Sequence, residues 1–259
     1  MEPDPTKRFS SRVEDYIRYR PSYPAAVTSW LAAECGLTAH SRIADVGSGT
    51  GILSRLFLDF GCDVFAVEPN PDMRAGAERQ LSAEPRFHSV DGRAEATTLR
   101  DTSVDFVTAG QSFHWFDAPT ARAEFRRILD PEGWVVLIWN ERLVTPGFLR
   151  EYEDLLQRLS TDYGRVDHRR IDSAEIARFF EHDSWRTVSF PNHQDFNWDG
   201  IRGRLLSSSY APLPGSPQYA PMMEELEGIF TKFQQDGQVK LIYETKMYVG
   251  RLEQAVPLS

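Results

Sequence analysis

The sequence is poor in cysteine, in long apolar runs and in positive charge. Its 259 residues include only two cysteines, Cys35 and Cys62, and no C-x-x-C pair, so neither a disulfide framework nor a cysteine-based metal site is expected. The strongest apolar run, Trp134–Trp139, is far too short to span a bilayer. The polar first twelve residues offer no apolar stretch for a secretory signal. We therefore expect reduced thiols in a cytoplasmic protein.

Acidic residues outnumber basic ones, 38 to 29, which gives a formal net charge of -9. Sequence-independent binding of nucleic acid needs a basic face, and an anionic membrane surface repels a negative protein. We expect no nucleic-acid partner and no membrane partner, and a monomer or a homodimer. The six histidines show no H-x-x-x-H or H-E-x-x-H spacing, and no G-x-S-x-G elbow occurs. The sequence therefore predicts neither a metal site nor a serine hydrolase.

Short apolar segments alternate with amphipathic ones through the first 140 residues. We expect strands at 42–46, 63–68, 87–90, 104–109 and 134–139, and helices at 25–35, 52–60, 71–82 and 119–129. This alternation is typical of a parallel sheet that helices cover on both sides. The predicted fold is α/β, a doubly wound, mostly parallel seven-stranded sheet with helices on both faces and a helical lid in the C-terminal half.

The rhythm changes after Asn140. We expect helices at 148–160, 173–180, 200–209 and 218–235, and strands at 185–196 and 239–252. Near the start of the chain, Pro21 and Pro24 forbid a continuous helix and leave a short segment of its own. We therefore predict a Rossmann-like cofactor-binding core with an N-terminal flap at residues 1–142. Residues 143–259 would supply the lid helices and the two last, antiparallel strands of the same sheet.

The sharpest feature is the glycine loop Asp45-Val46-Gly47-Ser48-Gly49-Thr50-Gly51, between the first strand and the next helix. Glycines allow a tight turn and let a ligand touch the backbone. A phosphate-binding P-loop would need a lysine where Ile52 follows the last glycine, and the dinucleotide fingerprint would need a glycine at that same position. Asp45 would also repel a pyrophosphate. A carboxylate there suits a cationic group, such as the ammonium of a methionine moiety.

A second acid, Glu68, ends the next strand, 17 residues after Gly51. An acid at that place can accept both hydroxyls of a ribose, as in α/β folds that bind nucleosides at the carboxyl edge of the sheet. Glycine loop and acid together are more specific than either alone, and they predict a nucleoside-containing ligand.

Several segments resemble a known family. They are Asp45 to Gly51, Glu68-Pro69-Asn70-Pro71-Asp72-Met73, Gly92-Arg93-Ala94-Glu95, Gln111-Ser112-Phe113-His114-Trp115-Phe116-Asp117 and Tyr16-Ile17-Arg18-Tyr19-Arg20-Pro21. The first three are similar to the successive cofactor motifs of class I S-adenosylmethionine-dependent methyltransferases. The last two are similar to the small-molecule branch around trans-aconitate methyltransferase, with a more distant likeness to quinone C-methyltransferases. The resemblance covers Phe9 to about Asn140.

The resemblance implies S-adenosylmethionine as the cofactor. It places the methionine part on the glycine loop, the ribose on Glu68 and the adenine against Met73. Arg93 stands where the family often has an acid, so the backbone of Ala94 would contact the adenine amino group instead. The expected cofactor-binding residues are Tyr16, Asp45, Gly47, Gly49, Gly51, Glu68, Pro69, Met73, Ala94, Glu95 and Gln111.

Three side chains are candidates for catalysis. His114, just past the fourth strand, can act as a base or orient the acceptor, or else it packs the cofactor pocket. Tyr19 and Arg20 lie in a segment that can fold over the pocket, and Arg20 can pair with a carboxylate, or else this is a solvated helix. The predicted function is transfer of a methyl group to an oxygen, nitrogen or carbon atom of a small molecule, with a carboxylate as one option. The alternative is a catalytically silent S-adenosylmethionine-binding regulatory or partner protein.

Overall fold

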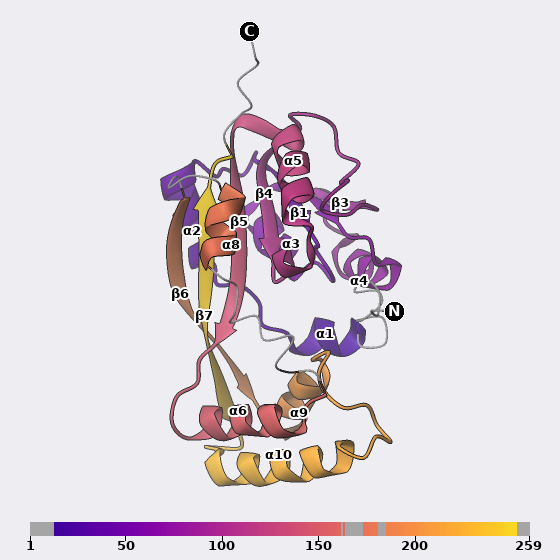
Figure 1. Cartoon of the computed structure of the whole chain (residues 1–259), viewed down its shortest axis with the longest axis vertical. Coiled ribbons are helices and arrows are strands. Elements are labelled where there is room, and N and C mark those ends of the chain that lie inside the picture. The colour runs from indigo at the N-terminus through magenta and orange to yellow at the C-terminus, as the bar shows by residue number, and fades with distance from the viewer. Residues whose placement is uncertain (1–12, 162, 164–172, 181–184, 253–259) are drawn as a thin grey trace.

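The computed structural model describes residues 13–161, 163, 173–180 and 185–252, and a seven-stranded sheet forms its centre (Figure 1). The strand order is β3-β2-β1-β4-β5-β7-β6. The strands are β1 (Arg42–Val46), β2 (Asp63–Val67), β3 (Phe87–Val90), β4 (Val104–Gly110), β5 (Leu129–Arg142), β6 (Trp185–Phe196) and β7 (Val239–Gly250). Strands β1 to β5 pair in parallel, and β7 pairs antiparallel with both β5 and β6. The predicted doubly wound, mostly parallel sheet is confirmed.

Helices cover both faces of the sheet. They are α2 (Ala26–Cys35), α3 (Ile52–Phe60), α4 (Pro71–Leu81), α5 (Ala118–Ile128) and α8 (Ser173–Phe180). On one face, α5 and α8 bury Phe125 and Phe179 together with Trp139 of β5. On the other face, α2 and α3 bury Leu31 and Phe57 against the sheet. Figure 1 shows α5 and α8 in front of the strands, with α2 and α3 behind. The sheet is thus buried on both sides, as its apolar strands require.

The C-terminal half supplies a separate group of helices beyond the carboxyl ends of the parallel strands. This group, which we call the lid, comprises α6 (Phe148–Leu159), α9 (Trp198–Leu206), α10 (Tyr219–Phe233) and the lower ends of β6 and β7 (Figure 1). The lid has its own apolar core, in which Leu156, Ile201, Leu226 and Leu241 are fully buried. Helix α1 (Val13–Tyr19) contacts both α9 of the lid and α4 of the sheet layer.

One predicted lid helix lies elsewhere. The sequence places Ser173–Phe180 in the lid region, but α8 packs on the face of the sheet beside α5. The ring of Phe179 meets that of Phe113 edge-on at 4.8 Å, and Arg122 Nε donates to the Phe179 carbonyl at 2.7 Å. The apolar side chains of α8 are therefore buried in the core of the sheet. The helices after residue 142 thus do not all belong to the lid, because α8 covers the sheet.

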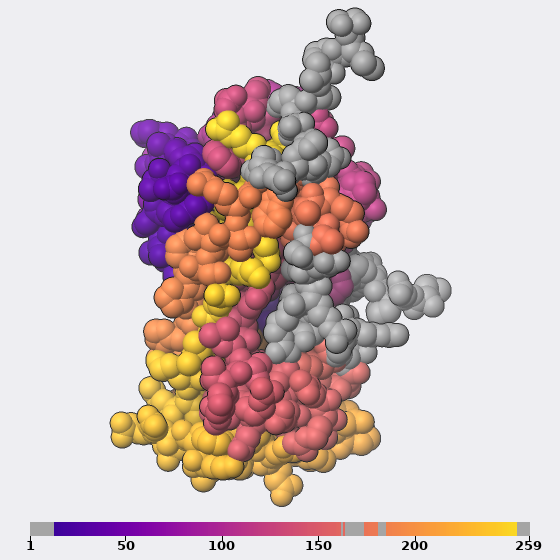
Figure 2. Space-filling view, turned by 60° about the vertical axis from the view of Figure 1, so that its left-hand side comes forward, coloured from indigo at the N-terminus to yellow at the C-terminus, as the bar shows by residue number. Residues whose placement is uncertain are grey.

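Strand β6, at one edge of the sheet, contacts α2. Arg186 of β6 lies over the ring of Trp30 at 4.9 Å and reaches Glu34 at 3.0 Å. The space-filling view shows α2 and β6 side by side there, with the lid at the far end of the molecule (Figure 2). Among the described residues, no helix combines the length and the apolar character needed to cross a bilayer.

Candidate active site

The glycine loop turns between β1 and α3 with three residues in the left-handed region. Gly47, Gly49 and Gly51 have φ values of 66°, 58° and 83°. A Cβ atom on Gly47 would lie 2.7 Å from Ser112 Cβ, and one on Gly51 would lie 2.5 Å from Leu81 Cδ1. Only glycine therefore satisfies both the conformation and the space at these positions.

Glu68 ties the end of β2 to this loop. One carboxylate oxygen accepts the backbone N–H of Gly49 at 2.8 Å, and the other accepts the N–H of Asn70 at 2.8 Å. Burial raises the pKa of Glu68, whereas the two backbone hydrogen bonds act in the opposite direction. Each carboxylate oxygen has a further lone pair, so the group can still accept hydroxyl donors from a ligand.

Asp45 lies at the end of β1, beneath the loop. Its side chain has no solvent exposure, and it accepts the hydroxyls of Ser54 at 2.6 Å and Thr108 at 3.3 Å. Burial raises the pKa of Asp45 to about 6, against the effect of the two hydroxyl donors. Asp45 is thus mostly ionised at pH 7, although its buried surroundings favour the protonated form.

A cavity of about 510 Å³ opens at the carboxyl edge of the sheet. We call it the cofactor cavity, and most of the predicted cofactor residues line it: Tyr16, Gly47, Gly49, Glu68, Pro69, Met73, Ala94, Glu95 and Gln111. Asn70 caps α4 by accepting the N–H groups of Asp72 at 2.9 Å and Met73 at 3.2 Å. That cap fixes the start of α4, from which Met73 projects beside the glycine loop.

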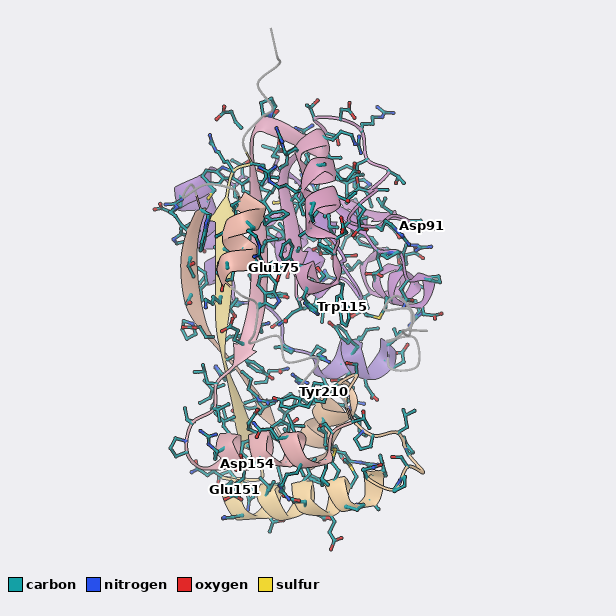
Figure 3. The ribbon with its side chains drawn as sticks, in the orientation of Figure 1. Asp91, Trp115, Glu151, Asp154, Glu175 and Tyr210 are labelled. Carbon is teal, nitrogen blue, oxygen red and sulfur yellow. The ribbon has the colours of Figure 1, made fainter. Side chains whose placement is uncertain are left out.

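A second, smaller cavity of about 110 Å³ lies toward the lid. We call it the lid cavity. The two cavities adjoin, because they share Tyr16, Arg20, Gly47, Gly49, Gly110, Gln111 and Tyr210. Figure 3 shows Tyr210 at the inner edge of the lid and Trp115 at the facing end of the sheet layer. Asp45 lines the lid cavity instead of the cofactor cavity.

The structure fits an S-adenosylmethionine cofactor in chemical terms. Glu68 offers carboxylate oxygens for hydroxyls, the loop glycines leave room for close backbone approach, and the Met73 thioether supplies an apolar wall. The buried hydroxyls of Ser48 and Thr50 have no hydrogen-bond partner among the described residues, so the loop has hydroxyl groups that can bond to a ligand. Within the same part of the chain, no group of three or more His, Cys, Asp or Glu side chains is placed to hold a metal ion.

Three predicted site residues do not line either cavity. Gly51 instead permits the close packing of α3 on Leu81, as its missing Cβ shows. The ring of Tyr19 packs against Gly203 of α9, where a Cβ atom would lie 2.1 Å from Tyr19 Cε2. His114 belongs to the short 3-10 turn η3 (Phe113–Trp115), which turns Trp115 toward the cofactor cavity, and its ring lies 4.6 Å from that of Trp115. Arg20 does line both cavities.

The sequence interpretation missed several lid residues. The lid cavity is also lined by Trp139, Tyr163, Arg204, Tyr210 and Tyr243. They come from β5, α9, β7 and the segments between them, so no fixed spacing connects them. One signal was available: Arg204 stands three residues after Ile201 and directly before Leu205, on the buried face of α9, where an arginine is unusual.

Comparisons with known proteins point to methyltransferases. A family model described as a methyltransferase domain matches residues 44–137. An uncharacterized methyltransferase of Mycobacterium tuberculosis is 37% identical over 155 residues, which are 60% of this chain and 61% of that protein. An uncharacterized methyltransferase-like protein of Schizosaccharomyces pombe is 28% identical over 96% of this chain and 97% of its own. A solved structure from Anaeromyxobacter dehalogenans, described as a candidate type II methyltransferase, has a TM-score of 0.69 at 23% identity and covers 91% of this chain and 99% of its own.

The chain thus carries a methyltransferase domain at residues 44–137, and its relatives and structural neighbours agree with the resemblance to class I S-adenosylmethionine-dependent methyltransferases. The motifs at 45–51 and 68–73 both lie within the residues that match the methyltransferase domain. The match to the mycobacterial relative spans about three fifths of that protein's length.

Proposed function

We propose that the protein is an enzyme that transfers a methyl group from S-adenosylmethionine to an oxygen, nitrogen or carbon atom of a small-molecule acceptor. The observation that carries this proposal is the pair of adjoining cavities, one lined by the glycine loop and Glu68, the other lined by the lid. Donor and acceptor would meet where the two cavities adjoin, beside Gln111 and Tyr210, which line both. The small-molecule branch around trans-aconitate methyltransferase, which the motifs resemble, fits a lid cavity of this small size.

The cofactor, when bound, supplies a methyl group on a positively charged sulfur, which becomes a neutral thioether as the methyl bonds to the acceptor. The chain's own residues then have to hold both partners in line and exclude water. Glu68 would accept the ribose hydroxyls, and Asp45 would attract the ammonium of the methionine part. Gln111, at φ 58°, is fixed by its N–H bond to the Ile138 carbonyl at 2.9 Å and would lie beside that part.

Arg20 is the predicted catalytic residue that lines both cavities, so we propose that it contacts one of the bound partners directly. His114 and Tyr19 would act through neighbours: His114 supports Trp115 at the cavity mouth, and Tyr19 docks the N-terminal segment on α9. The low cysteine count supports a cytoplasmic protein, and the negative net charge supports one that binds neither nucleic acid nor membranes. That it is a monomer or a homodimer stays a prediction.

The test is to incubate the protein with methyl-labelled S-adenosylmethionine and a panel of small acids, amines and phenols, and to detect labelled product by mass spectrometry. We expect labelled product with at least one class and none with Glu68→Ala, while Glu132→Gln, at a surface pair with Arg251, keeps full activity. Cofactor binding without any product would instead favour the silent binding protein. Absence of both would reject the family's activity for this chain.

A further inference from the structure

The lid cavity carries an excess of buried positive charge. Arg20, Arg142 and Arg204 all line it. The side chain of Arg142 is 9% exposed, and Arg204 is 5% exposed. Arg142 is neutralised, because it forms an ion pair with the buried carboxylate of Glu153. It therefore belongs to the scaffold of the lid.

Arg20 and Arg204 have no such partner. Among the described residues, neither guanidinium lies within ion-pairing distance of a carboxylate. Arg204 donates to the Tyr243 hydroxyl at 3.3 Å and to Ser208 Oγ at 3.1 Å, which are neutral groups. Arg20 donates to the Ser207 carbonyl at 3.1 Å, and its buried Nε has no hydrogen-bond partner in the described part of the chain. Buried charges without a counter-ion are costly, so this arrangement calls for an anion.

The two acids that line the lid cavity, Asp45 and Glu141, do not supply this anion. Asp45 is occupied by the hydroxyls of Ser54 and Thr108 at the glycine loop. Glu141 lies near Lys246: burial lowers the pKa of that lysine, but its bond to Tyr248 and the charge of Glu141 raise the pKa overall. Neither acid forms an ion pair with Arg20 or Arg204 in the described residues.

The electrostatic effect of the arginines reaches the wall between the two cavities. Burial lowers the pKa of Arg20, and the neighbouring charge of Arg204 lowers it further. Burial alone would raise the pKa of Tyr210, but Arg142, Arg204 and Arg20 outweigh burial, and the net result is a lowered pKa. Tyr210 lines both cavities, so the positive potential extends to the place where an acceptor would sit.

Arg204 differs from Arg20 in one respect: it lines the lid cavity and not the cofactor cavity. An anionic group on Arg204 therefore lies in the lid cavity, away from Glu68 and Met73, which would hold the ribose and the adenine of the cofactor. A carboxylate that is held by a guanidinium is also a weaker nucleophile, because its lone pairs are engaged.

We propose that the methyl acceptor is a small organic anion with a separate nucleophilic atom, and that Arg204 holds its anionic group in the lid cavity. The anion is a binding handle, and the methyl group goes to another atom of the same molecule. This inference rests on the proposed function and adds the charge of the acceptor and the residue that selects it.

The first test compares propionate with its neutral isostere propionamide. Saturation-transfer NMR titrations in the presence of S-adenosylhomocysteine should give an affinity at least tenfold higher for propionate. Arg204→Gln should lower propionate affinity at least tenfold, and Arg204→Lys, which keeps the charge but not the planar fork, should lower it less. The matched control is Arg186→Gln, at a surface arginine over Trp30, with no expected change. Equal affinity for the two probes in the unchanged protein, or no binding of either, overturns the proposal even if Arg204→Gln fails to fold.

The second test asks whether the anionic group is bound without itself being methylated. Propionate has an anionic group but no other nucleophile, so the protein should bind it together with methyl-labelled S-adenosylmethionine and form no labelled methyl propionate. Formation of that ester overturns the handle role. Calorimetry with S-adenosylhomocysteine on the same samples separates failure of this inference from failure of the proposed function. Cofactor binding without a preference for propionate rejects only this inference, whereas no cofactor binding rejects the proposed function beneath it.

Discussion

The carboxylate of Glu68 accepts the backbone N–H of Gly49 at 2.8 Å and so joins the end of β2 to the glycine loop after β1. The same carboxylate accepts the N–H of Asn70, at the cap of α4. The Glu68 side chain thus holds both the glycine loop and the start of α4 in place. Its remaining lone pairs are free to accept hydrogen bonds from a ligand in the cofactor cavity.

We expect Glu68→Ala to weaken cofactor binding by about 2–4 kcal/mol, because two hydrogen bonds to a charged group are lost. The folded protein should persist, with a lower free energy of unfolding, since two backbone N–H groups lose their acceptor. Calorimetry with S-adenosylhomocysteine and a urea titration measure the two effects. Unchanged affinity in a folded Glu68→Ala protein would assign this acid to the scaffold alone. Glu132→Gln, at the surface, is the control.

Comparing Gly47→Ala with Gly36→Ala separates loss of the cofactor-binding surface of the glycine loop from backbone strain alone. Gly47 and Gly36 both have positive φ, at 66° and 73°, but a Cβ on Gly47 meets Ser112 at 2.7 Å whereas one on Gly36 meets nothing within 4 Å. Both variants should lose about 1 kcal/mol or more of stability to the left-handed conformation. Only Gly47→Ala should also lose at least tenfold in cofactor affinity. Equal affinity of the two variants for S-adenosylhomocysteine would show that the loop does not cradle the ligand.

Asp45 makes a predictable contribution to the pH dependence of stability. Its pKa is raised to about 6 from the ordinary 3.8, so the folded protein binds this proton more tightly than the unfolded chain. The stability contributed by the protonated group is present below pH 4 and is lost as the pH rises to 6, in all roughly 3 kcal/mol at about 1.4 kcal/mol per pKa unit.

Asp45→Asn lacks that titration. Its free energy of unfolding should be close to that of the unchanged protein at pH 4 and should exceed it by roughly 2–3 kcal/mol at pH 7. Urea titrations of both proteins from pH 4 to pH 7 measure the difference. A difference that stays constant with pH would mean that Asp45 keeps its ordinary pKa. At pH 7 the same variant should bind the cofactor more weakly, because the attraction to an ammonium is gone.

The contact between Tyr19 and Gly203 holds the N-terminal segment on the lid. A Cβ on Gly203 would overlap the Tyr19 ring at 2.1 Å, whereas Gly228, also in a helix, has nothing within 4 Å. Gly203→Ala should therefore displace the segment that carries Tyr16 and Arg20, lower the melting temperature and weaken cofactor binding. Gly228→Ala should stabilise the protein by about 0.5–1 kcal/mol, as alanine does in a helix.

Hydrogen exchange with and without S-adenosylhomocysteine reads out the same contact. Residues 16–23 should gain protection on binding in the unchanged protein and less in Gly203→Ala. If these residues are equally protected with and without ligand, the segment is fixed scaffold, and Tyr16, Tyr19 and Arg20 leave the proposed site.

The sheet and the cofactor edge could be predicted from sequence because their signals are local. The glycine loop follows directly on β1, and Glu68 ends β2, so neighbouring strands bring them together. Side-chain direction could not be predicted in the same way. His114 and Tyr19 lie in the expected segments, but the η3 turn presents Trp115 instead, and Gly203 takes up the Tyr19 ring.

The lid resisted prediction because its contacts join distant parts of the chain. Arg204 and Tyr243 meet across 39 residues, and Tyr210 reaches the cavity from the segment that follows α9. The apolar pattern of Ser173–Phe180 predicted a helix correctly, yet it could not show that Phe113 and Arg122 hold that helix on the sheet. Tertiary partners, and not periodicity, decide which layer such a short helix covers.

The central claim is that the glycine loop and Glu68 bind S-adenosylmethionine, and isothermal titration calorimetry on the purified protein tests it most directly. S-adenosylmethionine and S-adenosylhomocysteine should each give a saturable heat with one site per chain, and NAD should give none, because Asp45 and Ile52 stand where a dinucleotide needs a neutral group and a glycine. No heat with either sulfur compound at millimolar concentration, or binding of NAD in their place, would contradict the account.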